Sequence, residues 1–189
     1  MTKEEFLLKY SLNHRFESLH KYQHNKPLKT AAVLIPLIDD GTQLNVLLTK
    51  RAIHLRHHAG QISFPGGKVE EKDKDLIDTA SRETHEEIGL TPDLINVVGN
   101  LHTYQVISGF VVTPIIAFIP NDYKFVKDPN EVSEIFQVPL AYFLNTSNHI
   151  SFKVQRKGFS HHVHFMPYKG YNIWGATASM LKDLVIHLQ

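Results

Sequence analysis

The stretch "GGKVEEKDKDLIDTASRETHEEIGL", residues 66–90, combines two glycines, a charged run and three closely spaced glutamates. A helix over residues 74–88, ended by the glycine at position 89, would rotate by about 100° per residue. Glu83, Glu86 and Glu87 would then lie within one arc of about 100°, beside an apolar face of the same helix. The pattern predicts three carboxylates that meet where the core borders solvent.

These glutamates and glycines together favour a site for a hard divalent cation. Mg2+ and Mn2+ prefer carboxylate oxygens and retain waters that substrate phosphates can displace. Glycines at positions 66 and 67 let the backbone approach a ligand, so the Gly66 carbonyl can join the metal shell. Taken alone, the glutamates fit an exposed acidic helix face and the glycines fit a simple turn.

The composition is that of a folded globular protein. A length of 189 residues fits a single domain over residues 1–189. Hydrophobic residues make up 42% and charged residues 21% of the chain, and the net charge is +1 without a basic block. This balance gives no electrostatic footprint for nucleic acid.

Two absences in the sequence narrow the class of protein further. The chain has no cysteine, which excludes disulfides and thiolate metal sites and leaves oxygen or imidazole ligands. No apolar run reaches the roughly 18 residues of a membrane span, and the first residues lack the apolar core of a signal peptide. We therefore expect a cytoplasmic protein with neither a nucleic-acid nor a membrane partner, and the sequence leaves a homodimer open.

The first third of the chain predicts a helix followed by a hairpin. Thr2 and Glu5 form a capping-box pattern, and helical spacing of apolar residues predicts a helix over residues 3–23. "KTAAVLIPLIDDGTQLNVLLTKR" predicts two strands around a tight turn, with Pro36 indicating an edge position or a bulge. Residues 51–65 show no clear period and predict a functional loop with a short strand near its end.

Strands dominate the predicted second half. "LINVVGNLHTYQV", "FVVTPIIAFI" and "DYKFV" are typical of strands, and the second of them is apolar enough to be buried on both faces. "EVSEIFQVPLAYFL" predicts a strand that runs into a short helix. "HISFKVQ" and "SHHVHFMPY" predict a hairpin, and "GATASMLKDLVIHL" predicts an amphipathic helix. The economical architecture is α/β, with helices packed on a mixed sheet.

The spacing around the glutamates matches a known signature. Gly67 is followed after five residues by Asp73, and after eight more by "RETHEEIGL". This pattern resembles the Nudix hydrolase signature of Gly, five residues, Glu, seven residues and Arg-Glu-apolar-x-Glu-Glu-x-Gly-apolar. Asp73 replaces a Glu, Thr84 replaces an apolar residue and the second spacing is one residue longer. The Nudix box would therefore span residues 67–90 with its glutamates in place.

The longer spacing and the preceding block resemble one branch of that family, the coenzyme A diphosphatases. The block is "LLTKRAIHLRHHAGQISFPGG", residues 47–67, and "YNIWGATA", residues 171–178, resembles the C-terminal end of the same branch. The resemblance implies a Nudix-type α/β/α sandwich around a mixed β-sheet, which holds Mg2+ or Mn2+ against a diphosphate.

The resemblance also implies roles for individual residues. The metal ligands would be the Gly66 carbonyl and the carboxylates of Glu83, Glu86 and Glu87, while Arg82 would be a structural ion-pair partner. A bound metal lowers the pKa of an attacking water, and a carboxylate must still accept its proton. The sequence leaves that general base open among Glu87, Glu131 and Glu134, and Glu83 is a further catalytic candidate.

The branch-specific loop would bind the substrate. Coenzyme A carries a 3′-phosphate besides its diphosphate, so its site requires further cations, and Arg51 and Arg56 lie in the loop. Gln61 and Phe64 would shape the same loop, although Phe64 also suits core packing. We therefore expect metal-dependent hydrolysis of coenzyme A or acyl-coenzyme A to 4′-phosphopantetheine, or its acyl form, and adenosine 3′,5′-bisphosphate. Hydrolysis of another nucleoside diphosphate derivative such as ADP-ribose, or nucleotide binding without turnover, are the alternatives.

Overall fold

A mixed β-sheet forms the centre of the computed structural model, which describes residues 1–12, 27–156 and 159–189. Its central strand β1 (Lys29–Asp39) runs parallel to β7 (Phe110–Ile119) and antiparallel to β2 (Leu44–Arg51). The other strands of this sheet pair antiparallel with these three: β3 (Ile62–Ser63) and β8 (Val132–Pro139) with β2, β4 (Gly66–Lys68) with β1, and β5 (Asn96–Asn100) and β6 (Tyr104–Val106) with β7. Strands β9 (Ile150–Arg156) and β10 (Phe159–Phe165) form a separate hairpin.

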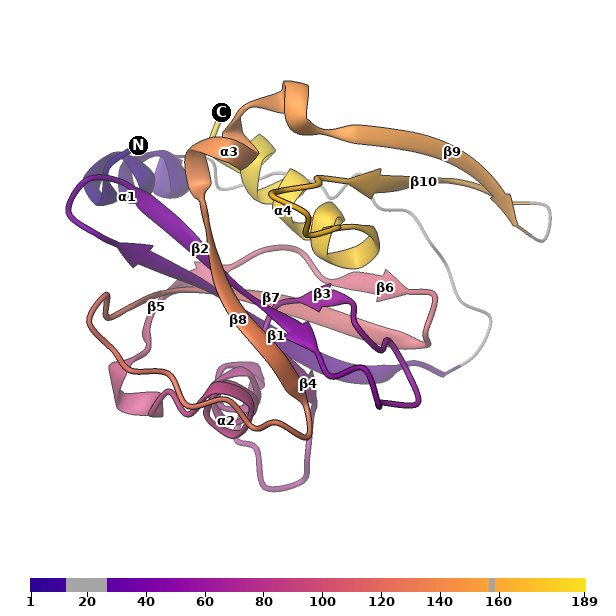
Figure 1. Cartoon of the computed structure of the whole chain (residues 1–189), viewed down its shortest axis with the longest axis horizontal. Helices are drawn as coiled ribbons and strands as arrows, with labels where there is room; N and C mark the ends of the chain where they lie inside the picture. The colour runs from indigo at the N-terminus through magenta and orange to yellow at the C-terminus, as the bar shows by residue number, and fades with distance from the viewer. Residues whose placement is uncertain (13–26, 157–158) are drawn as a thin grey trace.

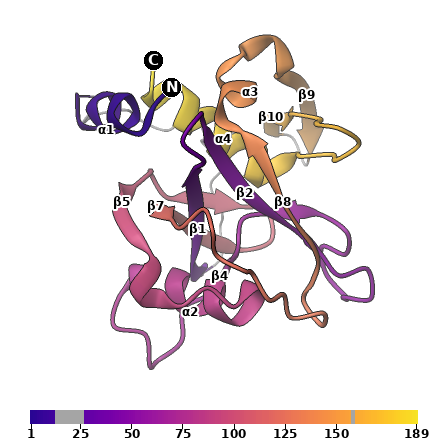
Figure 2. The same cartoon turned by 60° about the vertical axis from the view of Figure 1, so that its left-hand side comes forward.

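Helices cover both faces of the central sheet (Figures 1 and 2). Helix α2 (Leu76–Ile88) lies on one face. The opposite face carries α1 (Lys3–Leu12), α3 (Leu140–Leu144) and α4 (Gly175–His187). Two short 3-10 turns, η1 (Pro92–Leu94) and η2 (Thr146–Asn148), follow α2 and α3. The predicted α/β class, with helices on a large mixed sheet, is confirmed.

The alternation of side chains along β1 explains why both faces need a cover. Ala32 and Leu34 pack toward α2 in a cluster that includes Ala80. Ile35 and Leu37 belong to the larger core on the face of α4. Successive residues of a strand point to opposite faces, so a strand that is apolar throughout is stable only between two layers.

Local signals in the sequence set several of these boundaries. The N–H of Thr2 donates to Glu5 Oε2 at 2.9 Å, and the N–H of Glu5 donates to Thr2 Oγ1 at 3.2 Å, which completes the predicted capping box. The helix predicted over residues 3–23 is confirmed for residues 3–12, and its remainder lies outside the described residues.

Two predictions about strands are wrong. Pro36 lies in the central strand, at the point where one side of β1 changes its partner from β4 to β2. The proline ring lacks an N–H, and no ladder bond is needed from it at that change of partner. "DYKFV", residues 122–126, forms no strand, because its backbone bonds to the carboxyl end of α2. The N–H of Val126 donates to the carbonyl of Ile88 at 3.0 Å.

Candidate active site

Both ends of α2 are closed by side-chain and backbone chemistry that the sequence signals. Asp75 is the N-cap, and its Oδ1 accepts the N–H of Asp78 at 2.8 Å. Gly89 adopts φ 74°, and its N–H donates to the carbonyl of His85 at 2.9 Å. These two caps define a helix that contains all three glutamates, and the predicted end of the helix at Gly89 is confirmed.

Glu87 is the most buried of the three glutamates on α2. Its side chain is only 2% exposed, and its Oε1 lies 3.9 Å from Nη1 of Arg51. Burial raises the pKa of Glu87 to about 8, the charge of Arg51 opposes this rise, and the charge of Glu131 adds to it. Within the described residues, Glu87 Oε2 and Arg51 Nε are buried without a hydrogen-bond partner. A buried anionic oxygen without a partner is costly, and a cation would relieve that cost.

Glu83 lies directly against the glycine pair that precedes the helix. A Cβ atom on Gly67 would lie 2.3 Å from Cδ and 2.4 Å from Oε1 of Glu83. Burial raises the pKa of Glu83, and Arg82 opposes this rise. Glycine at position 67 therefore lets the Glu83 carboxylate lie against the backbone, a contact that a Cβ atom would block.

Arg82 holds the first half of the motif to the second. Its Nε and Nη2 donate to the two oxygens of Asp73 at 2.8 and 3.0 Å, which keeps the pKa of Asp73 well below its usual range. Nη1 donates to Glu83 at 2.9 Å and to Glu86 at 3.1 Å. The shorter Asp73 thus makes a bidentate pair with Arg82 across the lengthened spacing.

The donor chemistry of this cluster suits a divalent cation. Glu86 is half-exposed, with Glu83 and Glu87 behind it, and all three offer carboxylate oxygens. In the described parts of the chain, no three Asp, Glu or His side chains are already gathered as a coordination set. Arg82 engages Glu83 and Glu86. The Glu87 oxygen without a partner and the Glu83 carboxylate, which lies against Gly67, still fit a metal ion. The ion would compete with Arg82 for the carboxylate oxygens of Glu83 and Glu86.

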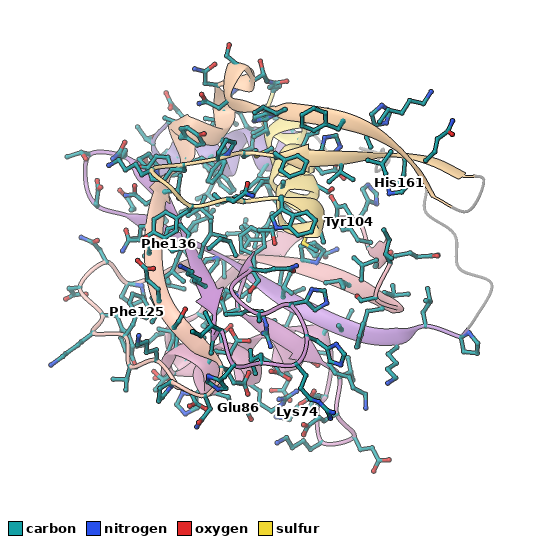
Figure 3. All side chains as sticks on the ribbon, turned by 45° about the vertical axis from the view of Figure 1, so that its right-hand side comes forward. Lys74, Glu86, Tyr104, Phe125, Phe136 and His161 are labelled. Carbon is teal, nitrogen blue, oxygen red and sulfur yellow. The ribbon has the colours of Figure 1, made fainter. Side chains whose placement is uncertain are left out.

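Of the two candidate bases outside α2, Glu131 and Glu134, the structure brings one to the cluster. Glu131 immediately precedes β8, and its charge raises the pKa of both Glu83 and Glu87. The carboxylate of Glu134 instead accepts the hydroxyl of Tyr171, whose ring stacks on Phe136 at 3.8 Å. Figure 3 shows Glu86 at the lower surface on α2 and Phe136 well above it on β8. The Glu134 carboxylate is therefore engaged by Tyr171, whereas Glu131 acts on the glutamates of α2.

The loop that follows β2 places its four predicted residues in different surroundings. Arg51 lies beside Glu87, and Gln61 pairs with its backbone, since the N–H of Arg51 donates to the Gln61 carbonyl at 2.9 Å. Arg56 is exposed on the loop. Phe64 is only 3% exposed and packs in the core on the face of α4. Of the two roles that the sequence allows for Phe64, the structure therefore shows core packing.

Sequence reasoning missed the segment of residues 120–131, which runs along α2 before Glu131 (Figure 2). It was predicted in part as a strand because "DYKFV" is aromatic and β-branched. Asp128-Pro129-Asn130 is the signal that could have indicated a turn there.

The metal-free protein is expected to lose stability as pH rises from about 4.5 to about 8. Glu87 has a pKa of about 8 in the folded chain and an ordinary value of 4.5, so between these values only the folded state keeps the proton. Its contribution is fully present below pH 4.5 and is lost as pH rises through 8, by at most about 1.4 kcal/mol per pH unit. Urea unfolding with a chelator at several pH values measures this slope. Glu87→Gln should flatten it, and identical slopes in both proteins would contradict the assignment.

None of the helices in the described ranges combines the length and apolarity that a membrane crossing requires.

Comparison with known proteins identifies the family. A model of the NUDIX domain matches residues 28–156. Two relatives, each named Uncharacterized Nudix hydrolase NudL, come from Enterobacter sp. (strain 638) and Salmonella newport (strain SL254). The first is 39% identical over 160 residues, which are 85% of this chain and 83% of the relative. The second is 40% identical over 183 residues, which are 94% of this chain and 95% of the relative.

Solved structures share the fold at low sequence identity. A C. elegans Ap4A hydrolase in a binary complex aligns with a TM-score of 0.51 at 20% identity, over 59% of this chain and 80% of that one. A MutT/nudix family protein from Enterococcus faecalis aligns with a TM-score of 0.52 at 16% identity, over 98% of this chain and 72% of that one. By its domain match and its relatives, the chain belongs to the Nudix family, whose members are hydrolases of pyrophosphate bonds.

Proposed function

We propose that this Nudix hydrolase cleaves the diphosphate of coenzyme A or acyl-coenzyme A, releasing 4′-phosphopantetheine, or its acyl form, and adenosine 3′,5′-bisphosphate. The observation that carries the proposal is the distance of 3.9 Å between Arg51 and Glu87. Arg51 belongs to the block that resembles coenzyme A diphosphatases, and Glu87 belongs to the Nudix box. The block and the box therefore share one site.

Nudix hydrolases generally use divalent metal ions, and we propose Mg2+ or Mn2+ here. Glu83, Glu86 and Glu87 would hold the ion with the Gly66 carbonyl, since these groups supply the oxygen ligands that both metals prefer. When bound, the ion neutralises diphosphate oxygens and lowers the pKa of a bound water. Glu83 and Glu86 would have to turn away from Nη1 of Arg82, whose pair with Asp73 can persist.

The protein's own groups would orient the substrate and accept a proton. Arg51 is partly exposed beside Glu87, so its guanidinium can face a phosphate of the substrate. We assign the role of general base to Glu131, because it lies beside the cluster without being needed as a metal ligand. Arg56, exposed on the same loop as Arg51, would bind the 3′-phosphate.

We also propose that residues 1–189 form one Nudix domain that acts in the cytoplasm. The family match leaves α1 and α4 outside its bounds, yet both pack on the sheet. Phe6 of α1 is fully buried, and its ring meets that of Phe118 on β7 edge to face at 5.7 Å.

Replacement of Arg56 by Ala tests the choice of substrate. Loss of a charge-assisted bond to the 3′-phosphate should raise KM for coenzyme A by about 10-fold or more and leave KM for dephospho-coenzyme A unchanged. Steady-state kinetics with both compounds and with ADP-ribose measure this difference. Lys29→Ala removes an exposed cation at the start of β1 and is the matched control. Equal changes of KM for the two coenzyme forms would contradict the role of Arg56. Turnover of ADP-ribose alone would show that the substrate is ADP-ribose and not coenzyme A.

A further inference from the structure

The segment of residues 123–131, which we call the strap, is fixed to the carboxyl end of α2. The N–H of Val126 donates to the carbonyl of Ile88 at 3.0 Å, and the hydroxyl of Tyr123 donates to the carbonyl of Gly89 at 2.6 Å. The last carbonyls of a helix lack partners within the helix, so these bonds join the strap to groups that need a donor. In Figure 2 the strap runs along α2 before the chain enters β8.

Asp128 lies at the centre of the hydrogen bonds that the strap makes. Its N–H donates to the backbone carbonyl of Glu87 at 2.9 Å, and its own carbonyl accepts the N–H groups of Glu131 and Val132 at 3.1 and 2.8 Å. Its side-chain Oδ1 accepts the backbone N–H of Asn130 at 2.8 Å and the side-chain amide of the same residue at 3.0 Å. The carboxylate of Asp128 thus closes the turn that delivers Glu131 to the site.

A further backbone bond fixes Glu131 to the substrate loop. The Glu131 carbonyl accepts the N–H of Ala52 at 2.8 Å, and Ala52 follows Arg51, which lies beside the Glu87 carboxylate. The backbone of Glu131 is therefore tied through Asp128 to Glu87 on one side and through Ala52 to Arg51 on the other. These bonds fix the backbone that carries the carboxylate proposed to accept the proton.

From this geometry we infer that Asp128 is a positioning residue, which sets the place of Glu131 relative to the glutamates of α2. The inference rests on the proposed hydrolysis, in which Glu131 is the general base. A turn that only connected β7 to β8 would contribute to stability and would not act on kcat through Glu131. The two cases differ in which kinetic constant changes and in whether that change needs Glu131.

Kinetics of three variants separate these cases, with coenzyme A and Mn2+ as the probe. Asp128→Ala should lower kcat by about 10- to 100-fold and change KM by less than about threefold, because a supporting contact is lost while substrate contacts remain. Asp128→Asn keeps a side-chain oxygen for the turn and should restore kcat to within about threefold of wild type. In a Glu131→Gln background, Asp128→Ala should change kcat by less than about twofold.

Asp122→Ala is the matched control, since it removes an exposed carboxylate from the same loop outside the strap. Unchanged kcat in Asp128→Ala, equal loss in Asp128→Asn, or full loss in the Glu131→Gln background would each overturn the inference.

Hydrogen exchange tests the strap without any turnover. Asp128→Ala should speed exchange of the Glu131 and Val132 amides by at least about tenfold, while Asp122→Ala leaves them unchanged. Unchanged exchange in Asp128→Ala would overturn the role of Asp128. If the wild-type protein released no product from coenzyme A or from ADP-ribose, the proposed hydrolysis would be wrong. The exchange rates alone would then show whether Asp128 fixes the backbone of Glu131.

Discussion

Glu87→Gln is expected to lower kcat/KM for diphosphate hydrolysis by about 10³-fold while leaving the fold intact. Glutamine has nearly the shape of glutamate but supplies one oxygen donor in place of a charged carboxylate, so a divalent cation loses a ligand. The side chain is only 2% exposed, which leaves little room for a water to replace the lost oxygen. Steady-state kinetics at saturating Mn2+ measure the effect.

The same variant should be at least as stable as the wild-type protein without metal at pH 8. Burial disfavours the charged form of Glu87, and the neutral amide removes that cost. Glu71→Gln, an exposed change within the same charged run, is the matched control and should alter neither kinetics nor stability. A Glu87→Gln protein with wild-type turnover would refute the assignment of this carboxylate to the active site.

Gly66→Ala is expected to lower the free energy of unfolding by about 3–5 kcal/mol, the largest loss of stability that we predict. Gly66 adopts φ 150°, and a Cβ there would lie 2.4 Å from the carbonyl oxygen of Ala32 and 2.5 Å from Cα of Val33. These are backbone atoms of the central strand β1, which cannot move aside without disturbing both layers. Urea unfolding measures the loss.

Gly67→Ala, at the next residue, is the comparison that separates a structural from a functional role of glycine. The three atoms nearest to its Cβ would all belong to the carboxyl group of Glu83, the far end of a side chain that can rotate away. We therefore expect a change of less than about 1 kcal/mol in stability but a 10- to 100-fold loss of metal affinity. If the two alanine variants lost equal stability, the separation between a structural and a functional glycine would be wrong.

The sequence predicts the fold well wherever a local signal specifies it. The apolar run of β7 forms a strand buried on both faces, and the pattern from Asp75 to Gly89 sets a helix with its caps. The prediction for Pro36 was wrong because the missing N–H of proline affects only one side of a strand. On that side β1 changes its partner from β4 to β2, which the local sequence does not reveal. "DYKFV" misled because its strand propensity was overridden by the carbonyls at the end of α2.

The candidate site likewise has a part that the sequence predicts and a part that depends on tertiary structure. Glu83, Glu86 and Glu87 share one helix, so their spacing alone predicts that they lie together. Arg51 and Glu131 come from other elements and reach the cluster only through the pairing of β2 with β8. Glu134 and Glu131 are both acidic residues in one short motif, and sequence could not separate them, because only the fold places Tyr171 beside Glu134.

The most direct test of the proposed activity is product analysis by mass spectrometry after incubation of the purified protein with coenzyme A and Mg2+ or Mn2+. We predict metal-dependent release of 4′-phosphopantetheine and adenosine 3′,5′-bisphosphate, with water as the only other reactant, and loss of this release in Glu87→Gln. Intact coenzyme A after incubation with either metal, under conditions in which the same preparation cleaves ADP-ribose, would contradict the proposed substrate.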